Sequence, residues 1–263
     1  MNSFYSQQAR CAVRWQELPG HGEPLVFIHG LGCASSYEYP RIVCDPQFGS
    51  RRAILIDLPG SGYSDKPEGY SYHTSAQAQV VIELLDHLAI TSFWLYGHSM
   101  GGSIAIETAE LAGSRLRGLI VSEPNFHAGG GAFSRGIAAQ TEASFVSAGY
   151  QAMLEAETSP WKGCLQSSAP WAVWRGAASL VKGVQPSWNA RFLNLPCPIW
   201  LIFGELSLPD PDFDEMRQQG VEVKIIPDAG HSMSWENPSA LAKALSDCLG
   251  EYLIRPTKSS TDL

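Results

Sequence analysis

Short apolar runs alternate along the chain with segments whose apolar residues recur at helical spacing. Most of these runs are solidly apolar rather than alternating, which is typical of strands buried on both faces of a parallel sheet. Residues 11–18 alternate instead, and this pattern predicts an antiparallel strand at an edge of the sheet. The apolar runs predict strands over 25–30, 53–57, 93–97, 119–123, 199–204 and 221–227.

The segments between these runs carry apolar stripes. Over 75–90, apolar residues recur at i, i+3, i+4, i+7 and i+10, the spacing of an amphipathic helix. Similar stripes predict helices over 102–112 and 238–253, and Pro238 suits a first helical position. Because strands and helices alternate, we expect an α/β fold, with a mostly parallel sheet flanked by helices on both faces.

One long segment interrupts this alternation. Between residues 124 and 194 no convincing strand pattern occurs, and a helix is expected after Pro170. The pattern predicts an α/β core over 1–123 and 195–263, with an inserted helical cap over 124–194. Four of the eight tryptophans fall in this cap. They indicate either an apolar or aromatic substrate pocket or simple aromatic packing of cap on core.

Composition narrows the class of protein. The 263 residues are 44% hydrophobic, which is enough to bury one core. A net charge of −8 argues against nucleic acid or an anionic membrane as a partner. No apolar run reaches the roughly 18 residues that suggest a membrane span, and no signal-peptide pattern opens the chain. The six cysteines show no metal-ligand spacing, so we expect free thiols, a cytoplasmic location, and neither metal nor organic cofactor.

The remaining bulk features are less informative. The polar tail over 255–263 is expected to fray. The chain contains no internal repeat. The sequence leaves the oligomeric state open, and a small-molecule substrate is the partner we expect.

The strongest chemical signal is the G-x-S-x-G pattern over 97–101, with Ser99 at its centre. It stands between an apolar strand and a helical segment, the context of a nucleophile elbow. A strand that turns sharply into a helix exposes the side chain at its apex, and the flanking glycines let neighbouring backbones pass closely. The helix N-terminus also favours a developing negative charge. The pattern therefore predicts Ser99 as a nucleophile.

A serine that attacks an acyl carbon creates an oxyanion, which requires fixed hydrogen-bond donors. One expected donor is the backbone N–H of Met100, the residue after the nucleophile. The other is expected from "HGLG" over 29–32, which follows an early strand. Glycines on both sides of Leu31 let its N–H turn inward. The sequence thus predicts an oxyanion hole formed by Leu31 and Met100.

His231 has the best position for a general base among the seven histidines. It lies in a glycine-containing loop between the last strand and the last helix. That loop returns to the edge of the sheet where Ser99 is expected. Since a serine hydroxyl needs a base within hydrogen-bond reach, we expect His231 to accept the proton of Ser99.

Four segments together resemble the α/β-hydrolase fold superfamily over nearly the whole chain. The resemblance implies the fold, Ser99 as nucleophile and His231 as base. It also implies Leu31 and Met100 as oxyanion donors, and an acid placed between the serine and the histidine in chain order. The acids of the second segment are expected to be structural. The segments are "HGLG" (29–32), "DLPGSGYSDKP" (57–67), "GHSMGG" (97–102) and "PDAGHSMSWENP" (227–238).

The acid that should orient the histidine is not at its most common place. In many relatives it closes a G-x-x-D after the strand over 199–203, but here that segment ends in Ser207. Asp210 or Asp212 could take over, whereas Glu205 adjoins the strand end and would turn inward with difficulty. Glu123 ends the preceding core strand, and some relatives place an acid at that tip. We therefore expect Glu123 as the acid, with Asp210 and Asp212 as alternatives.

These residues predict a serine hydrolase that cleaves a carboxylic ester of a small to medium apolar or aromatic substrate. The acyl group would pass through an acyl-enzyme on Ser99. A carbon–carbon bond hydrolase or a thioesterase with a similar catalytic triad is an alternative. A ligand-binding receptor that keeps the triad is another, which slow turnover with tight binding would reveal. Arg135, Arg175 and Arg191 in the cap either bind an anionic substrate group or are ordinary surface charges.

Overall fold

A computed structural model describes residues 1–254 of the chain. Its centre is an eight-stranded sheet with the order β1-β2-β4-β3-β5-β6-β7-β8. β2 pairs antiparallel with β1 and β4, and the remaining neighbours pair in parallel. The strands are β1(Asn2–Ser6), β2(Cys11–Leu18), β3(His21–Ile28), β4(Arg51–Asp57), β5(Phe93–His98), β6(Leu116–Ser122), β7(Ile199–Gly204) and β8(Glu222–Ile226).

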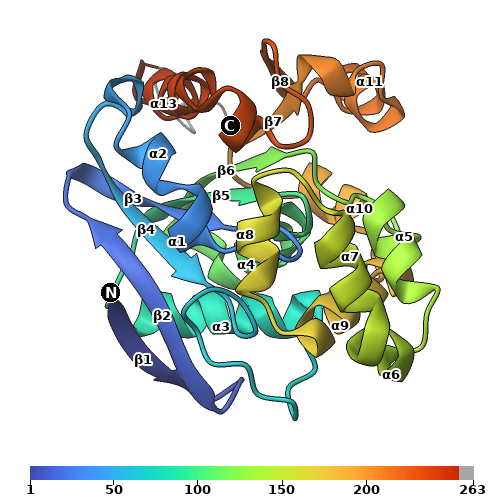
Figure 1. The fold of residues 1–263 in the computed structure, drawn as a ribbon. Helices are drawn as coiled ribbons and strands as arrows, with labels where there is room; N and C mark the ends of the chain where they lie inside the picture. The colour runs from blue at the N-terminus through green and yellow to red at the C-terminus, as the bar shows by residue number, and fades with distance from the viewer. Residues whose placement is uncertain (255–263) are drawn as a thin grey trace.

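Helices cover both faces of this sheet (Figure 1). α3 and α4 pack on one face, and α13 packs with α2 on the other. Within residues 1–254, no helix combines the length and the apolar character that a membrane crossing requires. The helices of the core are α1(Ser35–Glu38), α2(Pro40–Val43), η1(Pro46–Phe48), α3(Thr74–His87), α4(Met100–Ala112), η2(Gly113–Arg115), η4(Glu205–Ser207), α11(Pro211–Gln218), α12(Met233–Glu236) and α13(Pro238–Ile254).

The central strands bury both of their faces. Successive side chains of a strand point to opposite sides of the sheet. On β3, Val26 and Ile28 join the apolar core that includes α3 and α4, whereas Leu25 and Phe27 join the core that includes α13. All four side chains are fully buried. This two-sided burial explains why the parallel strands appear in the sequence as solid apolar runs.

One prediction about the sheet is wrong. β2 was expected at an edge, but β1 lies outside it and forms the edge strand. Phe4 and Ser6 of β1 are buried, while Tyr5 between them is exposed. The segment "NSFYS" has too few apolar residues to show an alternating pattern. One of its buried residues is Ser6, whose hydroxyl donates to Glu83 and accepts from the Ala9 N–H. An apolar pattern does not report such a polar partner.

All the regular secondary structure in the described segment between β6 and β7 is helical. None of its described residues forms a strand. In Figure 1 its α5, α6 and α7 lie together on the side of the molecule opposite β1 and β2. Trp188 in this insert is fully buried and its Nε1–H donates to Glu107 on α4 at 2.9 Å. The helices are α5(Ala132–Ala138), α6(Glu142–Ser144), η3(Phe145–Gly149), α7(Tyr150–Ala156), α8(Trp161–Gln166), α9(Pro170–Lys182) and α10(Trp188–Leu193).

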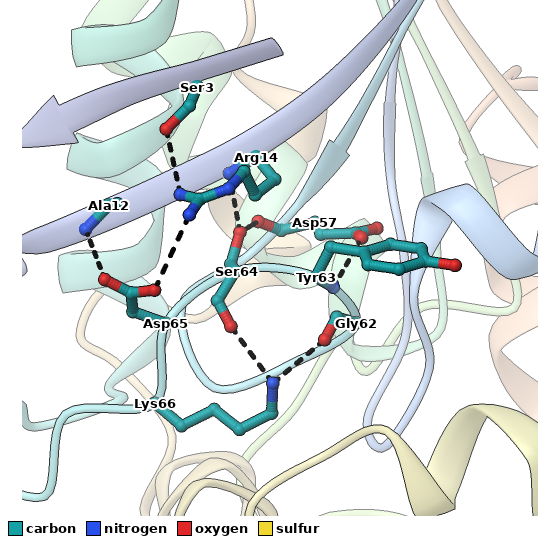
Figure 2. Close-up of polar contacts among 9 residues, drawn as sticks. All are labelled: Ser3, Ala12, Arg14, Asp57, Gly62, Tyr63, Ser64, Asp65 and Lys66. Atoms are coloured by element: carbon teal, nitrogen blue, oxygen red, sulfur yellow. Dashed lines mark hydrogen bonds and ion pairs between the residues drawn. The ribbon is translucent and has the colours of Figure 1, made fainter. Parts of the chain in front are cut away.

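The "DLPGSGYSDKP" segment after β4 forms a hydrogen-bonded loop against β2 (Figure 2). The Asp57 carboxylate accepts from the Tyr63 N–H at 3.0 Å, and Asp65 accepts from the Ala12 N–H at 2.9 Å. Lys66 Nζ donates to the carbonyl oxygens of Gly62 and Ser64 at 2.9 and 3.0 Å. These acids hold backbone in place, which agrees with a structural role. The polar tail over 255–263 lies outside the described residues.

Candidate active site

Ser99 occupies the sharp turn between β5 and α4. Its backbone has φ 54° and ψ −126°, a conformation that non-glycine residues rarely adopt. The turn needs glycine on both sides: a Cβ on Gly97 would lie 2.3 Å from the Gly101 carbonyl oxygen, and a Cβ on Gly101 would lie 2.3 Å from that of Ile28. The Ser99 N–H donates to the Ser122 carbonyl at 2.9 Å and ties the turn to β6.

His231 reaches Ser99 from the loop between β8 and α12. Its Nε2 lies 3.1 Å from the Ser99 hydroxyl oxygen. The loop is fixed at its base, because the Leu206 N–H donates to the Ala229 carbonyl at 2.8 Å and the Gly230 N–H donates to Glu236 at 2.7 Å. A serine hydroxyl and an imidazole nitrogen at this separation can exchange a proton directly.

Glu123 stands immediately after β6 and contacts the other side of the same imidazole. Its Oε2 lies 2.6 Å from His231 Nδ1, and its Oε1 accepts from the Gly204 N–H at 2.9 Å. The backbone of Glu123 has φ 39°, so it shares with Ser99 a left-handed conformation directly after a strand. The structure therefore brings Ser99, His231 and Glu123 into one hydrogen-bonded chain.

The Glu123 carboxylate is buried yet favours its charged form. Its side chain is 8% exposed, and burial alone would raise its pKa. The hydrogen bond and the charge of His231 oppose that effect, as do the Gly204 N–H and the Ser207 hydroxyl. Together they hold the pKa of Glu123 below its ordinary value. A carboxylate that stays ionised beside an imidazole can offset the charge of an imidazolium.

The loop after β7 holds the other carboxylates considered from the sequence. Ser207 occupies the position where many relatives carry the acid, and its side chain is near enough to Glu123 to help lower the pKa of that carboxyl group. Asp210 caps α11, where its carboxylate accepts from the N–H groups of Asp212 and Phe213 at 2.9 and 3.2 Å. Asp212 Oδ1 lies 3.7 Å from His127 Nε2. Burial and the charge of Asp210 raise the pKa of Asp212. Within residues 1–254, no hydrogen bond or ion pair joins either aspartate to His231, whose ring nitrogens lie next to Glu123 and Ser99.

The two expected oxyanion donors lie beside Ser99. Met100 is the first residue of α4, and Leu31 lines the same cavity as Ser99. A Cβ on Gly30 would lie 3.3 Å from the Ser99 Cβ, so this loop passes close to the serine. The Leu31 carbonyl accepts from Trp161 Nε1 at 3.2 Å, which fixes the loop from the insert. Across residues 1–254, the backbone N–H groups of Leu31 and Met100 have no protein partner.

A buried polar chain beneath the imidazole is a feature that the sequence analysis missed. The Ser122 hydroxyl lies 2.8 Å from the Tyr96 hydroxyl and 2.9 Å from His98 Nδ1. The His98 ring in turn lies 4.7 Å from that of His231, centroid to centroid. Burial and the neighbouring His231 lower the pKa of His98 to about 3, so this ring stays neutral. The available signal was a histidine and a serine at the last positions of two adjacent strands.

A cavity of about 430 Å³ opens above the three residues. The insert contributes Phe133, Ser134, Trp161 and Leu180 to its wall. Phe133 and Trp161 pack together, with ring centroids 5.2 Å apart. Of the four tryptophans of the insert, Trp161 lines the cavity, whereas Trp188 is fully buried and hydrogen-bonds to α4 of the core. The space suits a small to medium organic molecule.

The three arginines considered for an anionic group serve elsewhere. Arg175 donates to Glu142 and to backbone carbonyls, Arg191 pairs with Glu110 at 2.7 Å, and Arg135 donates to the Gly130 carbonyl. In the described structure none of them lines the cavity. The interpretation as ordinary surface charges therefore fits.

One cluster near the cavity mouth carries metal-ligating side chains. His127, Asp212 and Glu215 each place one ligand atom within 4.8 Å of the others. Asn189 Nδ2 already donates to Glu215 at 3.1 Å and lies 3.4 Å from His127 Nε2. Asp212 Oδ1 lies 3.7 Å from His127 Nε2, so hydrogen-bonding and charged partners within the protein already surround these three side chains.

Comparison with known proteins assigns the chain to a family. A model of the alpha/beta hydrolase family matches residues 25–244. The chain belongs to this family. The solved structure of a thermophilic esterase from Thermogutta terrifontis, with malate bound, superposes with a TM-score of 0.78 at 20% identity, over 95% of this chain and 98% of that one. At this identity the likeness shows the shared fold.

Two relatives of known name match this chain over very different shares of their length. The chain is 28% identical to the putative 2-succinyl-6-hydroxy-2,4-cyclohexadiene-1-carboxylate synthase of Bacillus subtilis (strain 168), over 95% of this chain and 98% of that protein. It is 38% identical to the dihydrolipoyllysine-residue acetyltransferase component of the acetoin cleaving system of Pseudomonas putida. That match covers 41% of this chain and spans 28% of the length of the relative.

Proposed function

We propose that this alpha/beta hydrolase is a serine esterase that cleaves a carboxylic ester of a small to medium substrate. The observation that supports the proposal is the chain from Ser99 through His231 to Glu123, with separations of 3.1 and 2.6 Å. It opens on a cavity of about 430 Å³. The likeness to an esterase fold is consistent with this reaction.

The proposed reaction begins when the Ser99 oxygen attacks the ester carbonyl carbon. The hydroxyl proton passes to His231 Nε2, and Glu123 stabilises the resulting imidazolium through Nδ1–H. The carbonyl oxygen becomes an oxyanion, which accepts hydrogen bonds from the N–H groups of Leu31 and Met100. These two groups suit that role because no protein acceptor in the described chain uses them.

Collapse of this intermediate expels the alcohol, which takes the proton from His231 Nε2. The acyl group then remains on the Ser99 oxygen as an ester. A water molecule loses a proton to the same nitrogen and attacks the acyl carbon. The second collapse releases the acid, and the Ser99 oxygen takes that proton from His231 Nε2 to restore its hydroxyl. His98 supports both steps, because a neutral ring adds no repulsion beside the transient imidazolium.

A second reaction class is favoured by one observation. The whole-length match to a putative synthase that forms a cyclohexadiene carboxylate raises carbon–carbon chemistry as the rival function. The cavity argues against a similar anionic substrate here. Five carboxylate side chains line it, and among the described lining residues there is no lysine or arginine. An ester without a negative charge fits this lining better.

Covalent labelling tests the proposal directly. We expect a fluorophosphonate to modify Ser99 in the native protein, and hydrolysis of 4-nitrophenyl acetate to disappear with the label. The Ser99→Ala variant should lose both, whereas Ser103→Ala, one turn into α4, is the matched control and should keep them. A folded protein that takes no label and hydrolyses no ester would refute the proposal.

A further inference from the structure

His98 stands directly before Ser99, and its ring forms part of the cavity wall although its side chain is only 6% exposed. Its Nδ1 lies 2.9 Å from the Ser122 hydroxyl. Within residues 1–254 no protein atom hydrogen-bonds to its Nε2, and this atom is accessible rather than enclosed. The adjoining Cδ2 faces Gly30 of the same wall, since a Cβ on Gly30 would lie 3.7 Å from it. Buried polar atoms are normally paired, so this nitrogen calls for a partner in the cavity.

Two buried hydroxyl groups determine which ring nitrogen of His98 carries the proton. Tyr96 and Ser122 are fully buried, and their hydroxyl oxygens lie 2.8 Å apart. The Tyr96 hydroxyl has no other hydrogen-bond partner in the described chain, so its proton is donated to Ser122 Oγ. The Ser122 hydroxyl then donates to His98 Nδ1. The opposite direction would leave the buried Tyr96 proton without an acceptor.

The His98 ring is therefore a neutral donor toward the cavity. Burial and the neighbouring His231 lower the pKa of His98 to about 3, so the ring holds a single proton near neutral pH. The Ser122 carbonyl also lies near the ring, but it already accepts from the Ser99 N–H at 2.9 Å. With Nδ1 acting as an acceptor, the single proton is on Nε2.

A neutral oxygen atom is the partner that fits this donor. Carboxylate side chains line the cavity, and no lysine or arginine lies among its described lining residues, so a negatively charged acceptor is disfavoured. Ether, carbonyl and hydroxyl oxygens accept a hydrogen bond without bringing a charge. The His98 ring lies 4.7 Å from that of His231, centroid to centroid, and His98 adjoins Ser99. The accepting oxygen is therefore expected close to the bond that reacts.

We propose that His98 is a substrate-binding residue whose Nε2–H donates to a neutral oxygen near the scissile ester. The natural substrates are then esters with a further ether, carbonyl or hydroxyl oxygen close to that ester. This inference rests on the proposed esterase function for the reacting group, whereas the donor itself can be tested without turnover. A hydrocarbon analogue of the same shape leaves the N–H unpaired in the cavity, which is the basis of the selectivity.

Two pairs of esters matched in shape test the selectivity. In each pair an ether oxygen replaces a methylene group: methyl methoxyacetate against methyl butyrate for the acyl side, and 2-methoxyethyl acetate against butyl acetate for the alcohol side. Titration of the released acid gives kcat/KM for each ester, and the ratio within a pair is compared between native protein and His98→Phe. Intrinsic differences in ester reactivity cancel in this comparison.

His98→Phe keeps a planar ring but lacks both nitrogens. In at least one pair, the preference for the ether ester should fall roughly fivefold in this variant, the size expected for one neutral hydrogen bond. His87→Phe makes the same replacement on the exposed end of α3 and should keep the native ratios. Ratios that His98→Phe leaves unchanged in both pairs would overturn the inference.

Nitrogen NMR of the native protein tests the donor even if His98→Phe fails to fold. With nitrogen-15-labelled histidine, the chemical shifts of the two ring nitrogens report which one is protonated, and comparison with His98→Gln assigns the His98 signals. We expect a protonated Nε2 and an unprotonated Nδ1. A proton on Nδ1 would overturn the inference.

The same four esters separate this inference from the esterase proposal when they are added to Ser99→Ala, which should bind them without cleavage. The His98 Nε2 resonance should move with an ether ester and not with its hydrocarbon match. Turnover by the native protein without such a difference leaves the esterase proposal standing and removes the role of His98. A selective shift without turnover by the native protein supports the donor and contradicts the esterase proposal.

Discussion

The tips of β6 and β7 are neighbours in the sheet but contribute different groups to the site. The β6 tip supplies the carboxylate of Glu123 to His231. The β7 tip and the loop after it stand where many relatives carry the acid, yet here the Gly204 N–H donates to that carboxylate and Ser207 helps to lower its pKa. In the proposed mechanism the imidazole needs a negative charge at a fixed point, which the β6 tip provides while the β7 tip holds the carboxylate in place.

The largest expected effect is on kcat, when the acid at the β6 tip is replaced and compared with the acids of the loop after β7. Glu123→Gln should lower kcat by about 10⁴-fold, because an amide neither stabilises the imidazolium nor favours the correct tautomer of His231. Asp210→Asn and Asp212→Asn are the controls from the β7 loop and should stay within about twofold of the native value. Steady-state kinetics on 4-nitrophenyl acetate measures all three, and the reverse ranking would move the acid to β7.

The polar chain beneath the β6 tip should be visible in the pH dependence of stability. His98 has a pKa of about 3 in the folded protein against an ordinary value of 6.5, so unfolding lets it take up a proton between these values. Above pH 6.5, His98 is neutral in both the folded and the unfolded protein and has no effect on stability. As the pH falls from 6.5 toward 3, only the unfolded chain takes up the proton, so the folded protein loses stability. The contribution is roughly 1.4 kcal/mol per pH unit within that window.

Denaturant unfolding of the native protein and of His98→Gln between pH 4 and 7 measures this contribution. The variant should show the shallower loss of unfolding free energy on acidification. His87→Gln on the exposed end of α3 is the control and should follow the native curve. Parallel curves for native protein and His98→Gln would contradict a neutral, buried His98.

Moving the acid between the tips sharpens the comparison further. In the Glu123→Gln background, Ser207→Asp should recover roughly tenfold of the lost kcat, because the new carboxylate starts from a side chain that already contacts residue 123. Ser207→Asn in the same background has a similar shape without the charge. If the asparagine and aspartate variants recover equally, charge at this point is not what the site needs.

The smallest effect concerns the support from β7. Ser207→Ala removes one donor to Glu123, so the pKa of that carboxyl group should rise and kcat/KM should fall roughly fivefold. Ser239→Ala, whose hydroxyl faces Asp45 away from the site, should leave kcat/KM unchanged. The acidic limb of the pH–rate profile should move upward for Ser207→Ala, and an unmoved limb would show that the hydroxyl does not tune Glu123.

Much of this architecture could be predicted from the sequence because it rests on local patterns. The parallel strands are apolar on both faces, and the turn at Ser99 needs glycines that stand in the sequence. The chain order of serine, acid and histidine narrowed the acid to a few candidates, and the strand-end position favoured Glu123 over Asp210 and Asp212. That role, like the oxyanion roles of Leu31 and Met100 and the boundaries of the cap, stays a prediction.

Other features depend on contacts between distant residues and leave no local pattern. β1 forms the edge of the sheet by pairing with β2, and its buried Ser6 contacts Glu83 on α3, which lies 77 positions away in the chain. Glu38 reaches Ser234 across 196 positions of the chain, so its burial could not be seen in "SSYE". Ser207 looked like a lost acid because its partner, Glu123, comes from another strand.

The hydrogen bond between Glu123 and His231 is the central claim, and proton NMR of the native protein tests it most directly. A short bond between an imidazole N–H and a carboxylate, here 2.6 Å, strongly deshields its proton. We predict a far-downfield imidazole N–H resonance in the native protein and in Asp212→Asn, and its loss in Glu123→Gln. A resonance that survives Glu123→Gln and disappears in Asp212→Asn would contradict the account.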